Sequence, residues 1–213
     1  MTGVVYTATF DRNDDLQPVL ATSQEARHVC FTDCHEPVEG WEMVRPERHC
    51  QTGRAEQQRC KILAHEYFRD VDFSVWCCWG ATLLVSAKEA RGWLPDDRHL
   101  AVARHPYRDC VYDEVGAVVD ARKETRENAY RLGRFLLSAG YPANNGLAAT
   151  TVLIRRHTGE MERFNELWWD TCNQYSMRDQ LAFDYVSWKL EMPYAVLPWG
   201  LADSPHWLWG PHD

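Results

Sequence analysis

The sequence lacks any long apolar segment, because none of its apolar runs approaches the roughly 18 residues that a membrane-spanning helix needs. It also lacks a basic leader with a small-residue cleavage site, since Met1 to Gly3 lead directly into the strand-like segment VVYTATF. No internal repeat or low-complexity segment interrupts the 213 residues. We therefore expect a cytoplasmic protein with no membrane partner, folded as one domain over residues 1–213.

Basic charge is scarce: 23 Lys and Arg stand against 31 Asp and Glu, for a net charge of −8. Nucleic-acid backbones bind to basic surfaces, so this balance disfavours a nucleic-acid partner while leaving a local basic groove open. The sequence also lacks the ligand spacing of a zinc finger, since Cys30 and Cys34 are not followed by a second Cys or His pair at the required separation. We interpret the eight cysteines as reduced thiols of an intracellular protein.

Segments rich in β-branched and aromatic residues alternate with segments of helical spacing, which predicts an α/β sheet with parallel pairs. Strands are predicted at 3–10, 26–33, 41–44, 71–85 with a break at Gly80, 99–107 and 146–157. Helices are predicted at 52–68, within 109–140, at 159–175 and at 177–190. Residues 190–213 form an aromatic, proline-rich tail. We interpret it as packed against the core, with an aromatic binding surface as the alternative.

Charged residues near predicted strand ends are the first functional candidates, because ligands of α/β sheets bind outside the carboxyl ends of strands. Arg59 and Lys61 lie two residues apart on the predicted helix 52–68 and are suited to a diphosphate, although their spacing alone favours solvent-facing charges. In the segment YSMRDQLAF, Ser176 is a plausible N-cap, and Asp179 three residues later resembles the second member of a capping box.

The segment HPYRDCVYDEVG concentrates titratable groups within one loop and one predicted helical turn. Its members are His105, Arg108, Asp109, Asp113 and Glu114. Such a density is typical of a functional pocket. An acidic first helical turn that complements the macrodipole explains it equally well.

These motifs, taken in order, resemble one known family. The segments are VVYTATF, VCFTD, QQRCKILAHEYFRDVDFSVW, RHPYRDCVYDE, GLAATTVLIRRH, ELWW and SMRDQLAFDYVSWK. Their order from Val4 to about Lys189 resembles the TOD/MUCI-type glycosyltransferase-like domain. The resemblance implies a GT-A-like, Rossmann-type sandwich with a mixed, mainly parallel central sheet, and a nucleoside diphosphate sugar as donor, with a UDP-sugar favoured.

The resemblance also implies roles for individual residues. On the donor side, Thr7 and Asp33 would lie near the base and ribose, and Arg59 and Lys61 near the ribose and phosphates. The candidate catalytic residues at the donor sugar are Arg178, Asp179 and Gln180. The acceptor side of the pocket would be formed by His105, Arg108 and Glu114.

The sequence departs from the family pattern at the metal motif. The family carries S-x-W-x-D-G-N at the end of a strand, and the alignment of Ser74 and Trp76 puts Cys78 and Gly80 where the acidic residue and the asparagine belong. A thiolate is a poor ligand for Mg²⁺ or Mn²⁺, which prefer oxygen. The acidic pair Asp70 and Asp72 precedes the strand and is interpreted as a surface turn.

Three interpretations of this degenerate motif stay open. In the first, a glycosyltransferase works without metal and uses Arg and Lys to stabilise the leaving diphosphate. In the second, other groups hold a metal, with His206 and His212 of the tail as candidates. In the third, a pseudoenzyme binds a nucleotide sugar or a glycan without transferring anything.

The main hypothesis is a glycosyltransferase that moves a sugar to a hydroxyl acceptor. Glycosylation of a modified DNA base is a further alternative, which the acidic charge disfavours. A hydrolase ranks last, because the sequence has neither a G-x-S-x-G elbow nor an H-E-x-x-H helix.

Overall fold

A computed structural model describes residues 1–11, 16–20, 26–34, 36–78, 80–200 and 204–209. Its central sheet has seven strands in the order β3-β2-β1-β4-β7-β6-β8. The strands span Gly3–Thr9 (β1), Arg27–Thr32 (β2), Glu42–Val44 (β3), Phe73–Cys77 (β4), Leu100–Arg104 (β6), Ala148–Arg156 (β7) and Ala195–Val196 (β8). A second, two-stranded sheet pairs β5 (Ala81–Leu83) with β9 (Trp207–Trp209).

The central sheet is mixed and mainly parallel, as the sequence predicts. β1 pairs in parallel with β2 and β4, β2 with β3, and β6 with β8. β7 runs antiparallel to both of its neighbours, β4 and β6. The carboxyl ends of β1, β2, β4 and β6 therefore reach the same edge of the sheet, at which β7 begins.

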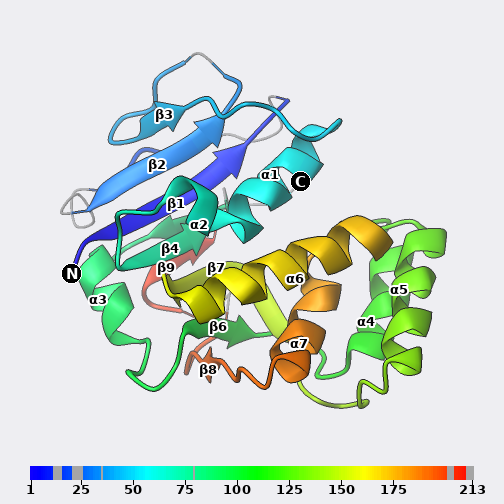
Figure 1. The fold of residues 1–213 in the computed structure, drawn as a ribbon. Helices are drawn as coiled ribbons and strands as arrows, with labels where there is room; N and C mark the ends of the chain where they lie inside the picture. The colour runs from blue at the N-terminus through cyan, green and yellow to red at the C-terminus, as the bar shows by residue number, and fades with distance from the viewer. Residues whose placement is uncertain (12–15, 21–25, 35, 79, 201–203, 210–213) are drawn as a thin grey trace.

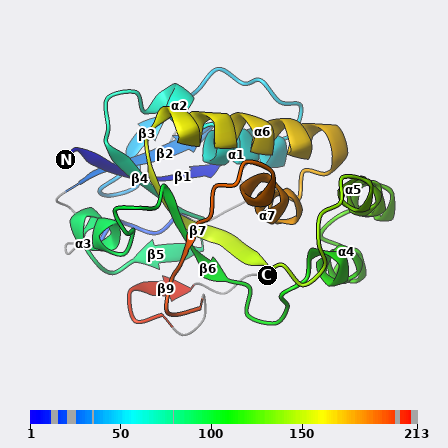
Figure 2. The same cartoon turned by 60° about the horizontal axis from the view of Figure 1, so that its bottom comes forward.

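Both faces of the sheet are covered (Figures 1 and 2). Val4 and Tyr6 of β1 belong to the core under α1 (Gly53–Ile62), α6 (Gly159–Tyr175) and α7 (Gln180–Lys189). Val5 points into the opposite core, which α3 (Ala87–Gly92) and the β5–β9 sheet cover. Side chains alternate between the faces of a strand, so a strand buried on both faces is apolar almost throughout. This explains why VVYTATF shows no polar alternation.

The predicted helical segments contain breaks that sequence spacing does not reveal. The segment 52–68 divides at Leu63 into α1 and the short α2 (Ala64–Tyr67), and the predicted cap is confirmed, since Thr52 Oγ1 accepts from the Ala55 amide at 3.2 Å. The segment 109–140 forms a hairpin of α4 (Val111–Asp120) and α5 (Arg126–Ser138), with Thr125 capping α5.

The capping-box interpretation of Ser176 is wrong. Ser176 is the C-cap of α6, and Asp179 occupies the N-cap position of α7 without a capping hydrogen bond from its side chain. The Ser176 hydroxyl instead donates to Glu124 at 2.6 Å and accepts from the Arg178 amide at 3.1 Å. Asp179 is therefore free of a capping role and has other partners.

The described part of the tail packs against the body of the protein. Trp199 and Trp207 contact Trp93, with ring centroids 5.0 and 6.4 Å from it, and the ring of His206 lies 4.7 Å from Trp93. This aromatic cluster supports the interpretation of a packed tail. Among the described residues, no helix is long and apolar enough to cross a membrane.

Candidate active site

Two aspartates close the first two strands of the sheet. Asp33 follows β2, and both of its carboxylate oxygens accept from the Asp11 amide, at 3.1 and 3.2 Å. Asp11 follows β1, accepts from the Gly53 amide at 2.6 Å and pairs with Arg48 at 2.8 Å. Arg48 also approaches Asp33 at 3.5 Å. The sequence pattern predicts a role for Asp33 but not for Asp11 or Arg48, although Asp11 also stands shortly after the end of its strand.

Thr7 lies inside β1 and not at its end. Its buried hydroxyl and Nε2 of His28 have no hydrogen-bond partner among the described residues. Both residues line a cavity of about 20 Å³ that Cys77 and Cys78 close on one side. A volume of this size holds about one water molecule, so the cavity has no room for a nucleobase in this conformation.

Three segments far apart in the sequence meet beyond the end of β4. Lys61 of α1 donates to Asp179 at 2.6 Å and to the Thr150 hydroxyl of β7 at 3.0 Å. Thr150 in turn donates to the same oxygen of Asp179 at 2.8 Å. The side chains of Lys61 and Asp179 are only 6% and 4% exposed. A buried ion pair of this kind retains its charges only if hydrogen bonds saturate it, and the Thr150 hydroxyl contributes to that.

Burial and charge act against each other in this pair. Burial raises the pKa of the Asp179 carboxyl, but Lys61 and Arg178 outweigh it and hold that pKa below its ordinary value. Burial lowers the pKa of the Lys61 ammonium, and Asp179 opposes that shift. Asp179 is therefore a carboxylate at neutral pH.

Arg178 and Gln180 flank Asp179. Arg178 contacts the Gln180 side-chain oxygen at 3.4 Å, and its own Nε is buried without a partner among the described residues. The side-chain amide of Gln180 donates to the Ala148 carbonyl at 2.9 Å, while the backbone amide of Ala148 donates to the Asp184 carboxylate at 3.0 Å. Both backbone polar groups of Ala148, the first residue of β7, are therefore hydrogen-bonded to side chains of α7.

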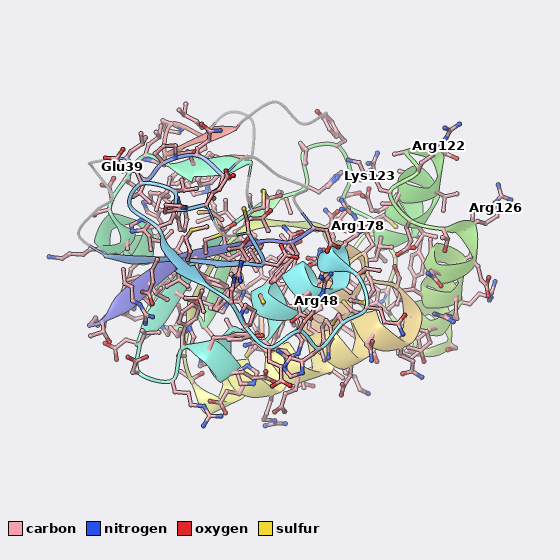
Figure 3. The ribbon with its side chains drawn as sticks, turned by 90° about the horizontal axis from the view of Figure 1, so that it is seen from above. Glu39, Arg48, Arg122, Lys123, Arg126 and Arg178 are labelled. Atoms are coloured by element: carbon pink, nitrogen blue, oxygen red, sulfur yellow. The ribbon has the colours of Figure 1, made fainter. Side chains whose placement is uncertain are left out.

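A rim of positive charge adjoins Arg178. Arg54 of α1 donates to the carbonyl of Lys123 at 2.9 Å, which holds the turn between α4 and α5 against α1. Figure 3 shows Lys123 and Arg178 near one another beside α1, with Arg122 and Arg126 farther out on the hairpin. The protein as a whole is acidic, so this rim is a local departure from its overall charge.

His105, Arg108 and Glu114 lie together. The side chain of Arg108 pairs with the buried carboxylate of Glu114, and the Arg108 amide donates to His105 Nδ1 at 3.1 Å. The Nε2 atom of His105 therefore carries the proton and faces Glu114 at 3.7 Å. Burial lowers the pKa of His105, which keeps the ring neutral despite the nearby carboxylate.

An open cleft of about 1240 Å³ begins beside this trio. Its lining comes from the end of β6 and the loop 105–109 after it, the loop before β7, the second half of α7 and the segment 191–196. Asp184 lies in its wall and accepts from the Tyr194 hydroxyl at 2.6 Å. Burial raises the pKa of Asp184 to about 6.

Arg59 is not brought together with Lys61. Arg59 donates to the Tyr67 hydroxyl at 2.5 Å and pairs with Glu66, so its side chain is committed to α2. Arg155 is completely buried and bonds to the Tyr6 hydroxyl and the Lys61 carbonyl, at 2.9 and 2.7 Å. In this conformation neither arginine is exposed to a ligand in the way that Lys123 is.

The residues at the metal motif do not fit Mg²⁺ or Mn²⁺. Cys78 follows β4, where its amide donates to the Thr151 carbonyl at 2.9 Å, and Gly80 has no side chain to offer. The acidic residue Asp72 binds the Thr2 amide at the opposite end of β4. His206 packs between two tryptophans, and His212 lies outside the described residues. Within the described ranges, no cluster of three His, Cys, Asp or Glu side chains is arranged to hold a metal.

Comparisons with known proteins agree on the kind of fold. The family model described as "TOD1/MUCI70, glycosyltransferase-like domain" matches residues 36–198. No protein of curated function matches the sequence. A solved structure titled "WbbM bifunctional glycosytransferase apo structure" is 11% identical, with a TM-score of 0.53, over 92% of this chain and 38% of its own. The chain thus spans well under half of that protein.

Two further structures each align with 92% of this chain at a TM-score of 0.50. One is a glycosyltransferase "involved in the glycosylation of the major capsid of PBCV-1", 9% identical and covered over 82% of its length. The other is mouse xyloside xylosyltransferase 1 in its apo form, 8% identical and covered over 84%. At identities this low, structural similarity shows the fold alone. It confirms the predicted GT-A-like sandwich.

Proposed function

The chain belongs to the TOD1/MUCI70 glycosyltransferase-like domain family, and we propose that it transfers a sugar from a nucleoside diphosphate sugar to a hydroxyl acceptor without a divalent metal. One observation carries the proposal. Lys61, Thr150 and Asp179 come from three distant segments and meet in a buried cluster beside the basic rim, at the sheet edge where α/β proteins bind ligands.

The donor would lie along this edge. Asp33 and Asp11 offer carboxylate oxygens beside the ends of β1 and β2, where a ribose hydroxyl would donate to them. A UDP-sugar is the favoured donor. Its base would approach the cavity of Thr7 and His28, whose unpartnered polar atoms can hydrogen-bond a base once the cavity opens. Lys61, Lys123 and Arg178 would face the diphosphate.

The charge of the leaving group decides how such a site works without metal. The acceptor oxygen bonds to the anomeric carbon while the bond from that carbon to the phosphate oxygen breaks. The nucleoside diphosphate leaves with the electron pair, and the acceptor proton passes to a basic group of the site or to solvent. Fixed cations such as Arg178 stabilise the negative charge that develops on the diphosphate. Asp179 and Gln180 would orient the donor sugar or the acceptor, because their oxygens accept from sugar hydroxyls.

The experiment is calorimetric titration of the protein with UDP and a panel of UDP-sugars, with EDTA, Mg²⁺ or Mn²⁺ in parallel, followed by mass spectrometry of products. We expect binding that survives EDTA. Arg178→Gln should weaken UDP binding about tenfold, the value of one charge-assisted hydrogen bond. Arg126→Gln is the matched control, since Arg126 lies farther out on the hairpin (Figure 3) and should leave binding unchanged. No binding at millimolar UDP or UDP-sugar would refute the proposal, and loss of binding in EDTA would refute its metal independence.

A second function, nucleotide-sugar or glycan binding without transfer, is favoured by a specific observation. The carboxylate of Asp179 is already closed into the Lys61 pair, and Cys78 and Gly80 stand at the metal motif. Asp179→Asn separates the two functions. Binding that is kept while turnover is lost supports a transferase, whereas binding without turnover in both proteins supports a binding module. A modified DNA base ranks lower as acceptor because the net charge is −8.

A further inference from the structure

The open cleft beside His105 lies apart from the donor edge just described. Its lining residues come from the end of β6 with the loop after it, the loop before β7, the second half of α7 and the segment up to β8, and they include neither Asp11 nor Asp33. Its volume of about 1240 Å³ exceeds the roughly 300–1,000 Å³ of pockets for single drug-sized molecules. The cleft therefore has room for an extended ligand of several units.

Two aromatic side chains in its wall are exposed to solvent. Tyr107 is 81% exposed and Trp188 is 37% exposed. Exposed rings of this size concentrate at recognition sites, where they offer a large apolar face at a low cost in side-chain entropy. Trp188 packs edge to face with Tyr141 and at a tilt against Tyr185, with ring centroids 5.6 and 6.1 Å away. Tyr107 packs its edge against His105 at 6.0 Å.

The charges of the cleft balance. Its lining contains three basic side chains and three acidic ones, namely Arg104, Arg108, Lys189, Asp109, Asp184 and Glu191. Such a wall offers donors and acceptors side by side but no net field. A polyanion requires a surplus of Lys and Arg. A lipid chain requires a wall without charges. A neutral sugar chain requires rings for its apolar faces and paired polar groups for its hydroxyls, and the cleft has both.

One residue, Ala148, links the wall of the cleft to the candidate catalytic residues Asp179 and Gln180. The amide of Ala148 donates to Asp184 in the cleft wall, while the carbonyl of the same residue accepts from Gln180, the neighbour of Asp179. His105 closes the junction, because its amide donates to the Leu147 carbonyl at 2.8 Å. Only the backbone of Ala148 therefore separates the hydrogen bond of Asp184 in the cleft wall from that of Gln180.

We propose that this cleft binds the acceptor and that the acceptor is an uncharged oligosaccharide, with Tyr107 and Trp188 stacking on its sugar rings. The identification of this ligand as the acceptor rests on the proposed transferase function. The stacking platform itself rests only on the cleft. Tyr107 is the more informative of the two rings, because its exposure means that the fold does not depend on it.

The test uses the full chain and a panel of neutral hexasaccharides of glucose, xylose, mannose and galactose, measured by saturation-transfer NMR and by calorimetry. We expect at least one to bind. Tyr107→Ala should weaken it by about three- to tenfold, as expected for one lost aromatic contact, and Tyr107→Phe should retain the affinity. Tyr130→Ala is the control, since Tyr130 is also an exposed tyrosine, 42% exposed on α5, but does not line the cleft.

UDP titration of the same variants separates this inference from the proposed function. Unchanged UDP binding in Tyr107→Ala, together with weakened sugar binding, supports both. If UDP binds and none of the hexasaccharides does at millimolar concentration, the acceptor assignment is overturned while the transferase proposal stands. If a hexasaccharide binds at Tyr107 but UDP does not bind at all, the transferase proposal fails and the cleft is a glycan site alone. Single-stranded DNA or heparin that binds more tightly than every neutral chain, and loses affinity in Tyr107→Ala, would overturn the choice of an uncharged ligand.

Discussion

Removing either charge of the buried Lys61–Asp179 pair should destabilise the protein and should do so with opposite pH dependence. In Asp179→Asn the ammonium of Lys61 loses the carboxylate it pairs with. In Lys61→Met the carboxylate of Asp179 loses the ammonium it pairs with. Each side chain is less than a tenth exposed, so solvent cannot replace the lost partner. Breaking a buried pair from one side costs about 3–5 kcal/mol.

The group left behind can lose its charge, and this limits the cost. Lys61 has an ordinary pKa of 10.5, so deprotonating it at pH 7 costs about 5 kcal/mol at 1.36 kcal/mol per pH unit. Asp179 has an ordinary pKa of 3.8, so protonating it at pH 7 costs about 4 kcal/mol. Both limits agree with the range for a broken pair.

The sign of the pH dependence follows from which state binds the proton. In Asp179→Asn the unfolded chain keeps Lys61 protonated up to pH 10.5 while the folded chain does not, so stability rises with pH above 7. In Lys61→Met the folded chain holds a proton on Asp179 that the unfolded chain releases above pH 3.8. Stability therefore rises as the pH falls from 7 towards 4.

The assay is urea unfolding of both variants and of the Lys61→Met, Asp179→Asn double variant at several pH values, with the wild type subtracted. The double variant should cost less than the sum of the single ones, because it leaves no unpaired charge. Glu42→Gln is the matched control: its pair with Arg27 also spans 2.6 Å but is about half exposed, and breaking it should cost less than about 1 kcal/mol. Single-variant costs below 1 kcal/mol, or slopes of the same sign in both variants, would refute the reasoning.

Three further predictions concern single residues. Burial raises the pKa of Asp184 to about 6, so the wild type should lose about 3 kcal/mol relative to Asp184→Asn as the pH rises from 4 to 7, measured by urea unfolding. Burial lowers the pKa of His157 to about 4, so the wild type should lose a similar amount relative to His157→Gln as the pH falls from 7 to 4; a flat difference would contradict this. Thr52→Ala removes the cap on the Ala55 amide and should cost about 1 kcal/mol, and an unchanged unfolding midpoint would show that the cap contributes nothing.

Local pattern was sufficient for most of the elements. The strands at VVYTATF and at 148–156 carry continuous β-branched and apolar residues, and the Thr52 cap is a local hydrogen bond. Local pattern failed at Ser176. This serine lies between two helices, so the sequence is compatible both with a cap at the start of α7 and with the end of α6, and the structure makes it the C-cap of α6. In the folded protein the Ser176 hydroxyl donates a hydrogen bond to Glu124, which lies 52 residues away in the sequence.

The sequence by itself determined the alternation of strands and helices, the acidic balance and the motif order that resembles a glycosyltransferase-like family, because each of these is local or simply counted along the chain. Only the tertiary structure decided which charged residues act together. Arg59 and Lys61 are two residues apart, yet one pairs with Glu66 of α2 and the other with Asp179, which is 118 residues away. Adjacent positions on a helix point in different directions, so the neighbours of a side chain depend on how the elements pack. The cleft of Tyr107 and Trp188 has the same origin, since three separate stretches of the chain enclose it, residues 104–109, 145–147 and 184–196.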